Sequence, residues 1–430
     1  MEFYIFAYIA LLLLVALLST RLMKVIKLPN VTGYIIVGIL MGPFVFGLLF
    51  NSFTFEGIKD SPIYLCVDRI KWVSTVALGF IAFSIGTSFR AQTLKVVGKK
   101  VIIITCLEAL LASVFVIAIL VGAHFIFPEQ VTWPLVLTLG AIASATAPAA
   151  TLMVIKQYNA RGPLVNTLLP VVALDDAAAL ILFAILFQIA TTLAIGGEFS
   201  IYKMLFKPII EILISLGIGA VLGFLISFMN RFFKSRNNRL IWCIFSVFAA
   251  IGCYYLFKYP FMGGFELSSL LICMMAGVIY TNMCKDSDRT LDVMDRFTSP
   301  IYMMFFVISG ASLDLSIFFN GKGLLLVGVA FAYIIFRVIG KYLGAYAGCS
   351  ISKCEPQVKK YLGLALIPQA GVAIGLATNA NALFSSNPAT AEIGGLIIAI
   401  ILTSTLVYEL VGPLFSKLAL SKAGEIPDTI

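Results

Sequence analysis

Long apolar runs alternate with short polar segments from one end of the chain to the other. Most runs are near 20 residues, the length that a helix needs to cross roughly 30 Å of hydrocarbon. The pattern predicts an all-α polytopic membrane protein with about thirteen transmembrane helices. The predicted spans cover residues 3–20, 31–50, 72–89, 101–127, 131–155, 163–195, 208–229, 240–257, 261–281, 299–320, 323–349, 360–382 and 390–416.

The basic residues between these runs predict the orientation. Of the 30 lysines and arginines, 21 fall in loops on one side and 7 on the other, and Arg337 and Lys341 lie inside the span at 323–349. Because cytoplasmic loops are enriched in Lys and Arg, we expect the N-terminus outside and the C-terminus in the cytoplasm of a bacterial inner membrane.

Two spans are expected to be interrupted. The fifth contains Ser144-Ala145-Thr146-Ala147-Pro148 and the twelfth contains Pro368-Gln369-Ala370-Gly371. Spans 1–6 and 8–13 can be two repeats joined by the seventh span. Because the first and eighth spans then cross the membrane in opposite directions, the repeats are inverted, and the two interrupted spans occupy equivalent positions in them. Ordinary proline kinks are the alternative. Paired interruptions at matching positions favour crossing helices at a transporter's binding site, with Ala147, Pro148, Pro368, Gln369 and Gly371 at the crossing.

Composition excludes soluble domains. Hydrophobic residues make up 61% of the chain, mean hydropathy is +1.04, and 12% of residues are charged, against about 25% in soluble domains. The net charge of +9 is spread over loops instead of one face, which argues against a nucleic-acid partner. We expect one transmembrane transporter domain over 1–430, no soluble domain and no cofactor.

Two adjacent acids carry the candidate chemistry. Asp175 and Asp176 lie about 12 residues into the sixth span, about 18 Å deep at 1.5 Å per residue. Acids in mid-membrane are costly and are functional by default. Burial and mutual repulsion favour a protonated form of at least one of them near physiological pH. Such a carboxylate can carry a proton in one direction and a cation in the other.

Arg337 and Lys341 are four residues apart and share one helix face. Two buried cations need a counter-charge, and the aspartates can supply it, but depth does not choose between the cations. Other polar residues are interpreted as packing, capping or interface groups instead of an access funnel or proton relay. They are Glu108, Glu266, Glu409, Asp314 and His124.

These residues resemble the bacterial monovalent cation/proton antiporter superfamily, which includes the sodium/proton antiporters. The markers are Leu174-Asp175-Asp176, the run from Ile339 to Gly344, and the Pro300…Phe305-Phe306…Gly310 helix. The resemblance implies that Asp176 carries the proton or Na⁺, that Asp175 pairs with Lys341, and that Thr146 lies near the ion. The chain departs from many members by having Ala147 after that threonine and Ala370 before Gly371, and both departures bear on ion selectivity.

The resemblance also implies that different segments of the chain have different roles. Residues 101–195 and 323–418 would form the ion-translocating core, 1–100 and 240–320 a dimerising scaffold, and 208–229 a linking helix.

The prediction is therefore a homodimeric antiporter that exchanges protons for a monovalent cation, with Na⁺ expected and K⁺ as the alternative. An organic-anion transporter is disfavoured because the aspartates would repel the anion. An aspartyl protease needs its two acids on facing helices. Only flux measurements distinguish a transporter from a non-transporting sensor.

Overall fold

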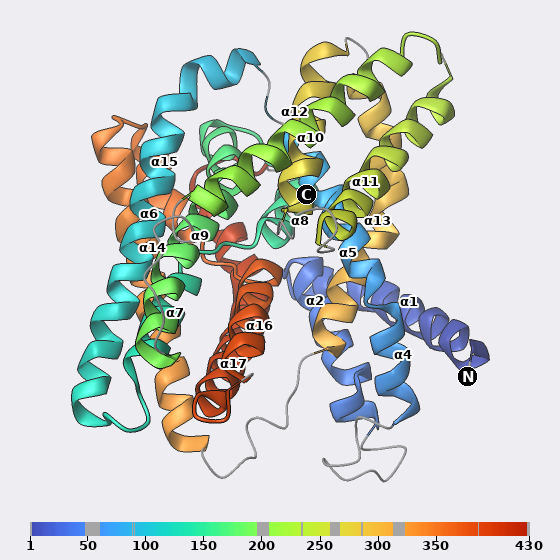
Figure 1. Ribbon diagram of the computed structural model, residues 1–430. Coiled ribbons are helices and arrows are strands. Elements are labelled where there is room, and N and C mark those ends of the chain that lie inside the picture. Colours follow the sequence, from blue (N-terminus) through green and yellow to red (C-terminus); the bar gives the residue numbers. More distant parts are fainter. Residues whose placement is uncertain are drawn as a thin grey trace. The chain divides into compact units, whose positions relative to one another are not determined.

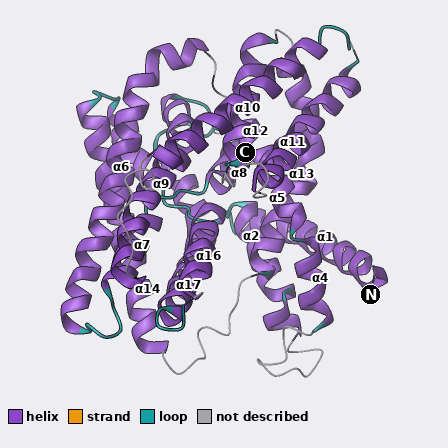
Figure 2. Cartoon of the chain, viewed as in Figure 1, coloured by secondary structure: helices purple, strands orange, loops and turns teal. Residues whose placement is uncertain are grey.

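The computed structural model describes residues 2–47, 61–87, 89, 91–195, 206–233, 235–258, 267–284, 287–312, 323–385 and 387–427. This part of the chain consists of helices joined by loops, which Figure 2 shows in purple and teal, and it contains no strand. The predicted all-α class is therefore confirmed. Glu266 and Asp314, two of the acids considered above, lie outside the described residues.

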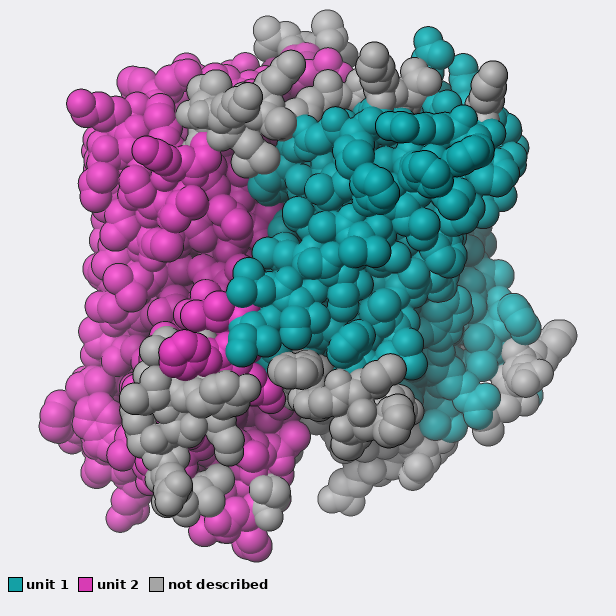
Figure 3. Space-filling model, turned by 45° about the horizontal axis from the view of Figure 1, so that its top comes forward, with its two compact units in different colours: residues 1–96, 210–313 teal, residues 97–209, 314–430 magenta. Residues whose placement is uncertain are grey.

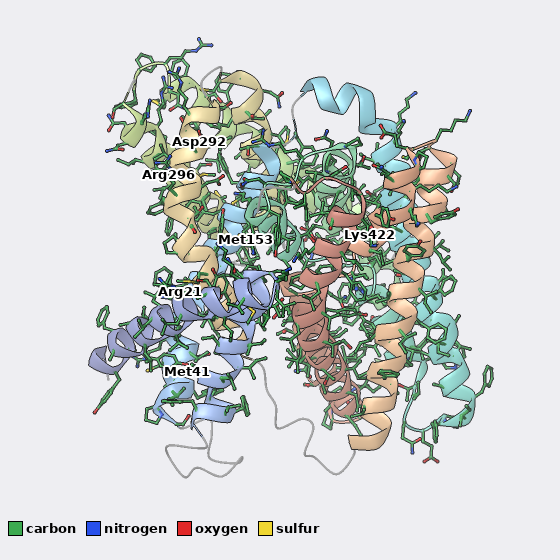
Figure 4. All side chains as sticks on the ribbon, turned by 180° about the vertical axis from the view of Figure 1, so that it is seen from behind. Arg21, Met41, Met153, Asp292, Arg296 and Lys422 are labelled. Atoms are coloured by element: carbon green, nitrogen blue, oxygen red, sulfur yellow. The ribbon has the colours of Figure 1, made fainter. Side chains whose placement is uncertain are left out.

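Nine helical segments within the described ranges are long and apolar enough to cross a membrane. The other four predicted spans depart from that simple form. Two are interrupted, and α12, Ser269–Met283, has only 15 residues. The fourth corresponds to α13, Ser287–Ala311, whose first turns are charged and include Asp292 and Arg296 (Figure 4). The chain is a multi-pass membrane protein, and the count of thirteen stays a prediction.

The chain forms two compact units, which Figure 3 colours separately. One comprises residues 1–96 and 210–313 and the other 97–209 and 314–430, so each takes helices from both halves of the sequence. These boundaries lie close to those of the predicted scaffold and core, with most of the predicted linking helix inside the first unit. The functional roles of the two units stay a prediction.

The first unit contains eight α-helices and a short π-helix among its described residues. They are α1 (Glu2–Val25), α2 (Asn30–Met41), η1 (Pro43–Gly47), α4 (Pro62–Ile70), α5 (Trp72–Thr87), most of α10 (Lys207–Met229), α11 (Arg236–Lys258), α12 and α13.

Glycines bring helices of this unit into direct backbone contact. Gly38 of α2 faces Gly310 of α13, and Gly86 of α5 faces Gly277 of α12. A methyl group at any of these glycines would overlap a backbone carbonyl of the opposite helix. Small residues are the usual means of close helix packing in lipid, where apolar burial alone does not drive association.

The second unit repeats one pattern twice. A long helix is followed by an interrupted helix and by a second long helix (Figure 1). The first set is most of α6 (Ala91–Ile126), the pair α7 (Trp133–Ile142) and α8 (Pro148–Gln157), and α9 (Pro163–Ile195). The second set is α14 (Gly323–Ile351), the pair α15 (Pro356–Ala365) and α16 (Gly371–Ser385), and α17 (Ala391–Lys422). The two interruptions predicted from Pro148 and Pro368 are therefore confirmed.

The segment that follows α17 caps the start of α9. Glu425 is 6% exposed, and its carboxylate accepts hydrogen bonds from the backbone N–H groups of Leu164 and Val165. Its backbone carbonyl accepts a third from Arg161 N at 3.0 Å. The first N–H groups of a helix have no partner inside the helix, and an acid there also complements the helix dipole. The far end of the chain thus fixes the beginning of the helix that carries Asp175 and Asp176.

Replacing Glu425 by Ala is expected to destabilise the protein by about 1 kcal/mol, because two buried N–H groups lose their acceptor. Thermal unfolding in detergent measures the effect. Glu355→Ala is the matched control, since Glu355 is exposed and its side chain makes no cap hydrogen bond to α15. An equal shift of the unfolding midpoint in the two variants would contradict the capping role.

Candidate functional site

The two helix interruptions are joined by their backbones. Pro148 has no N–H and disfavours helix in the preceding residue, so Ala147 is extended with φ −93° and ψ 108°. Its N–H donates to Pro368 O in the second interruption at 2.9 Å. Gln369 adds a side-chain link, donating from Nε2 to Ile142 O at 3.0 Å and accepting from Tyr333 Oη at 3.2 Å. Residues 143–147 and 366–370 therefore form one connected crossing.

Arg337 of α14 holds this crossing together. Its three guanidinium nitrogens donate to Ala143 O at 2.9 Å, Ala145 O at 2.6 Å and Ile367 O at 2.7 Å. The group also lies 4.6 Å from the ring centre of Tyr408, and Arg337 is completely buried. Ala143 is the C-cap of α7, and Ala145 and Ile367 follow the C-terminal ends of α7 and α15, where partial negative charge favours a cation. On sequence grounds Arg337 is the rival of Lys341 as the partner of Asp175, but its hydrogen-bond partners in the structure are backbone carbonyls.

Lys341, one turn further along α14, lies beside the aspartates. Its ammonium donates to Ser144 O, to Thr146 Oγ1 at 2.7 Å and to Asp175 Oδ2 at 2.9 Å. Lys341 and Asp175 are both completely buried. The structure thus brings together three residues of the predicted site, from the crossing, α9 and α14.

Asp175 and Asp176 differ in their surroundings although they are neighbours on α9. Asp175 is bound to Lys341 through one oxygen, and Asp176 is 7% exposed against 0% for Asp175. The Oδ1 atoms of both accept no hydrogen bond from the described part of the protein. Adjacent residues on a helix point in directions about 100° apart, so the Asp175 carboxylate can pair with Lys341 while the Asp176 carboxylate stays slightly exposed. Unpaired, buried carboxylate oxygens are suited to bind a proton or a hard cation.

Glu108 of α6 completes the cluster, although the sequence predicts a packing or interface role for it. Its Oε2 lies 2.6 Å from Lys341 Nζ, and the side chain is completely buried. A signal for this contact was present in the spacing of small residues on α14.

Gly340, Gly344 and Gly348 follow one another at intervals of four and form one face of α14. Methyl groups there would overlap the backbone of α6 at Ala112, Glu108 and Ile104, which are also four apart. The glycine stripe therefore lets the two helices approach closely and places Glu108 beside Lys341.

The remaining polar candidates lie elsewhere. His124 is near the end of α6, where its Nδ1 is 2.6 Å from Val131 O and its ring is 4.8 Å from that of Trp133. This aromatic and backbone setting fits the interfacial role expected for it. Glu409 is 3% exposed on α17.

A bundle with two crossing interruptions beside buried carboxylates and a lysine defines a secondary transporter instead of an enzyme. Two carboxylates on adjacent residues of one helix cannot face each other across a water molecule as aspartyl protease chemistry requires.

Comparisons with known proteins agree with this class. The family model described as "Sodium/hydrogen exchanger, transmembrane" matches residues 9–416. The chain is 26% identical over 372 residues to the Na(+)/H(+) antiporter NhaS4 of Synechocystis sp., covering 81% of this chain and 82% of that protein. The chain therefore belongs to the sodium/hydrogen exchanger family, and its class of activity is cation/proton antiport.

Two solved structures share the fold. Both are of the sodium proton antiporter MjNhaP1 from Methanocaldococcus jannaschii. The structure at pH 8 gives a TM-score of 0.63 at 19% identity, with 98% of this chain and 99% of that chain covered. The electron-microscopy structure gives 0.74 at 18% identity, with 97% of each chain covered.

Replacing Arg337 by Gln is expected to destabilise the protein by about 3 kcal/mol or more, because buried carbonyls of both interruptions lose a charged donor. The midpoint of thermal unfolding in detergent is the measurement, with the exposed Arg231→Gln as control. An Arg337→Gln protein that is as stable as the control variant, yet transports poorly, would assign Arg337 an ion-handling role instead of a structural one.

Proposed function

We propose that the protein exchanges protons for Na⁺ across the cell membrane, with Asp175 and Asp176 as the shared proton and cation site and Lys341 as their charge partner. The observation that carries the proposal is the pairing of Lys341 with Asp175 beside an Asp176 that keeps an unpartnered oxygen. Family membership supports the class of exchange, and the name of the Synechocystis relative, a Na(+)/H(+) antiporter, supports Na⁺.

The charge of this group explains why proton and cation compete. Two ionised aspartates and one ammonium carry a net charge of −1, which is costly inside a membrane. One proton or one monovalent cation at Asp176 neutralises that charge. Because either ion satisfies the same requirement, the departure of one favours the arrival of the other.

The surroundings offer further oxygen atoms for a cation. Thr146 Oγ1 already lies within hydrogen-bond distance of Lys341, which in turn contacts Asp175, so the hydroxyl is near the Asp175 carboxylate. Hard monovalent cations are bound by oxygen ligands, and carboxylate and hydroxyl groups are of that kind. We therefore include Thr146 in the proposed Na⁺ site.

Alternating access of this site to the two sides of the membrane would couple the two ion fluxes without ATP. In the proposal, the unit containing residues 97–209 and 314–430 carries the ions and the other unit forms the scaffold of a homodimer. The helix interruptions within the ion-carrying unit support this assignment, because broken helices at mid-membrane are the common location of transporter binding sites.

Asp176→Asn is expected to abolish exchange while the protein still folds, because the amide neither releases a proton nor neutralises a cation. Proton flux in proteoliposomes is measured after Na⁺, Li⁺ or K⁺ is added in turn, with the exposed Asp68→Asn as a control that retains exchange. Near-normal flux by monodisperse Asp176→Asn protein would remove Asp176 from the site. A response of the wild type to K⁺ and not Na⁺ would assign the alternative cation.

The distribution of basic loops supports an extracellular N-terminus and a cytoplasmic C-terminus. Ser235 is exposed between α10 and α11, in a loop that this orientation places in the cytoplasm. A Ser235→Cys protein, with the eight native cysteines replaced, should be shielded from an impermeant thiol reagent in intact cells and labelled after lysis. Labelling from outside would invert the topology.

A further inference from the structure

Glu108 occupies a place in the ion cluster that a simple salt bridge does not explain. An ammonium group has three N–H donors, and those of Lys341 go to Ser144, Thr146 and Asp175. Glu108 is the fourth oxygen partner, in ion-pair contact but without a hydrogen bond of regular geometry. Both of its oxygens lack a hydrogen-bond partner within the described residues, although the side chain is completely buried.

The charge count points in the same direction. Glu108, Asp175 and Asp176 would carry three negative charges if all were ionised, against one positive charge on Lys341. The other buried cation nearby on α14, Arg337, is committed to backbone carbonyls. A net charge of −2 in a buried cluster is strongly unfavourable. A proton on Glu108 removes one of these charges and supplies a donor.

That donor has an acceptor close by. Glu108 Oε2 and Asp175 Oδ2 contact the same nitrogen atom, at 2.6 and 2.9 Å, so the two carboxyl groups are neighbours. Asp175 Oδ1 accepts no hydrogen bond from the described residues. A protonated Glu108 can therefore donate a hydrogen bond to the neighbouring Asp175 carboxylate, whose Oδ1 otherwise has no donor among those residues. An ionised Glu108 has no proton to donate.

We propose that Glu108 is a proton-carrying site of the antiporter, protonated while Lys341 is paired with Asp175 and ionised when a cation occupies the two aspartates. The proposal rests on the function proposed above and adds a second exchangeable proton to it. On cation arrival the O–H bonds of Glu108 and Asp176 break, two protons leave, and one monovalent cation enters. The net charge of the cluster therefore falls from 0 to −1, so each exchange moves one net charge across the membrane. Lys341 keeps its proton and exchanges Asp175 for Glu108 as its counter-ion.

The geometry favours this exchange of partners over loss of the lysine's proton. A neutral amine has two N–H groups, so one of the three present acceptors of Lys341 would lose its donor. In contrast, both carboxyl groups already touch Nζ, and the ammonium can change partner through a small movement. The close glycine-mediated contact of α6 with α14 holds Glu108 at that position.

The test is the number of protons exchanged per cation, from reversal potentials in proteoliposomes. Glu108→Gln imitates the protonated form and cannot release a proton, so the ratio should fall by one proton per cation while exchange persists and thermal stability is retained. Glu409→Gln, a buried glutamate of the same unit, should keep the wild-type ratio.

Equal ratios in the wild type and Glu108→Gln, or loss of stability without a change of ratio, would overturn the proposal and leave Glu108 as a structural ion-pair partner. If Glu108→Gln does not fold, the proton-to-cation ratio of Lys341→Arg distinguishes the two possible sources of the second proton, because the guanidinium of arginine does not deprotonate. A wild-type ratio at reduced rate supports Glu108, and a ratio lower by one assigns the second proton to the lysine. Absence of cation-driven flux in the wild type would instead refute the proposed function.

Discussion

Breaking two helices inside a membrane leaves backbone groups without partners, and the lipid supplies none. In this protein the breaks meet at the hydrogen bond from Ala147 N to Pro368 O, and four further carbonyls receive donors from α14. Arg337 serves Ala143, Ala145 and Ile367, and Lys341 serves Ser144. The cations are therefore required by the crossing itself, and the acids beside them follow from the need to balance charge.

Arg337 and Lys341 differ in the chemistry of their side chains, and their contacts differ accordingly. A planar guanidinium with five donors can bridge several fixed carbonyls and keeps its charge, which suits the permanent role of Arg337. The ammonium of Lys341 is compact and sits on a flexible stem, so it can exchange one carboxylate for another. In the proposed mechanism, one turn of α14 thus separates a group that fixes the crossing from a group that takes part in ion exchange.

Close packing brings the third acid into the same cluster. The stripe of Gly340, Gly344 and Gly348 removes side chains from the face of α14 that meets α6, so the helices approach to backbone contact. Glu108 then reaches Lys341 without extending across a gap. The same kind of glycine contact joins α2 to α13 and α5 to α12 in the other unit. Glycine therefore sets the distance between helices in both units. Beside the α14 stripe, the close contact also brings a carboxylate, that of Glu108, to a lysine.

Several features of this protein follow from the sequence by itself. Apolar length predicts the membrane spans, proline and small residues predict the interruptions near Pro148 and Pro368, and depth along one helix predicts that Asp175 and Asp176 are buried. These are local properties, because hydropathy, a missing N–H and a rise per residue depend on neighbouring positions alone.

Local sequence properties left open which charges meet, and only the family resemblance implied the Asp175–Lys341 pair before the tertiary structure decided it. Lys341 contacts Asp175 and Glu108, and Arg337 contacts carbonyls, although the two cations are four residues apart on one helix face. Glu425 caps a helix that begins about 260 residues earlier in the chain. Such contacts depend on the rotation and spacing of whole helices, which an isolated span leaves undefined until it packs against the others.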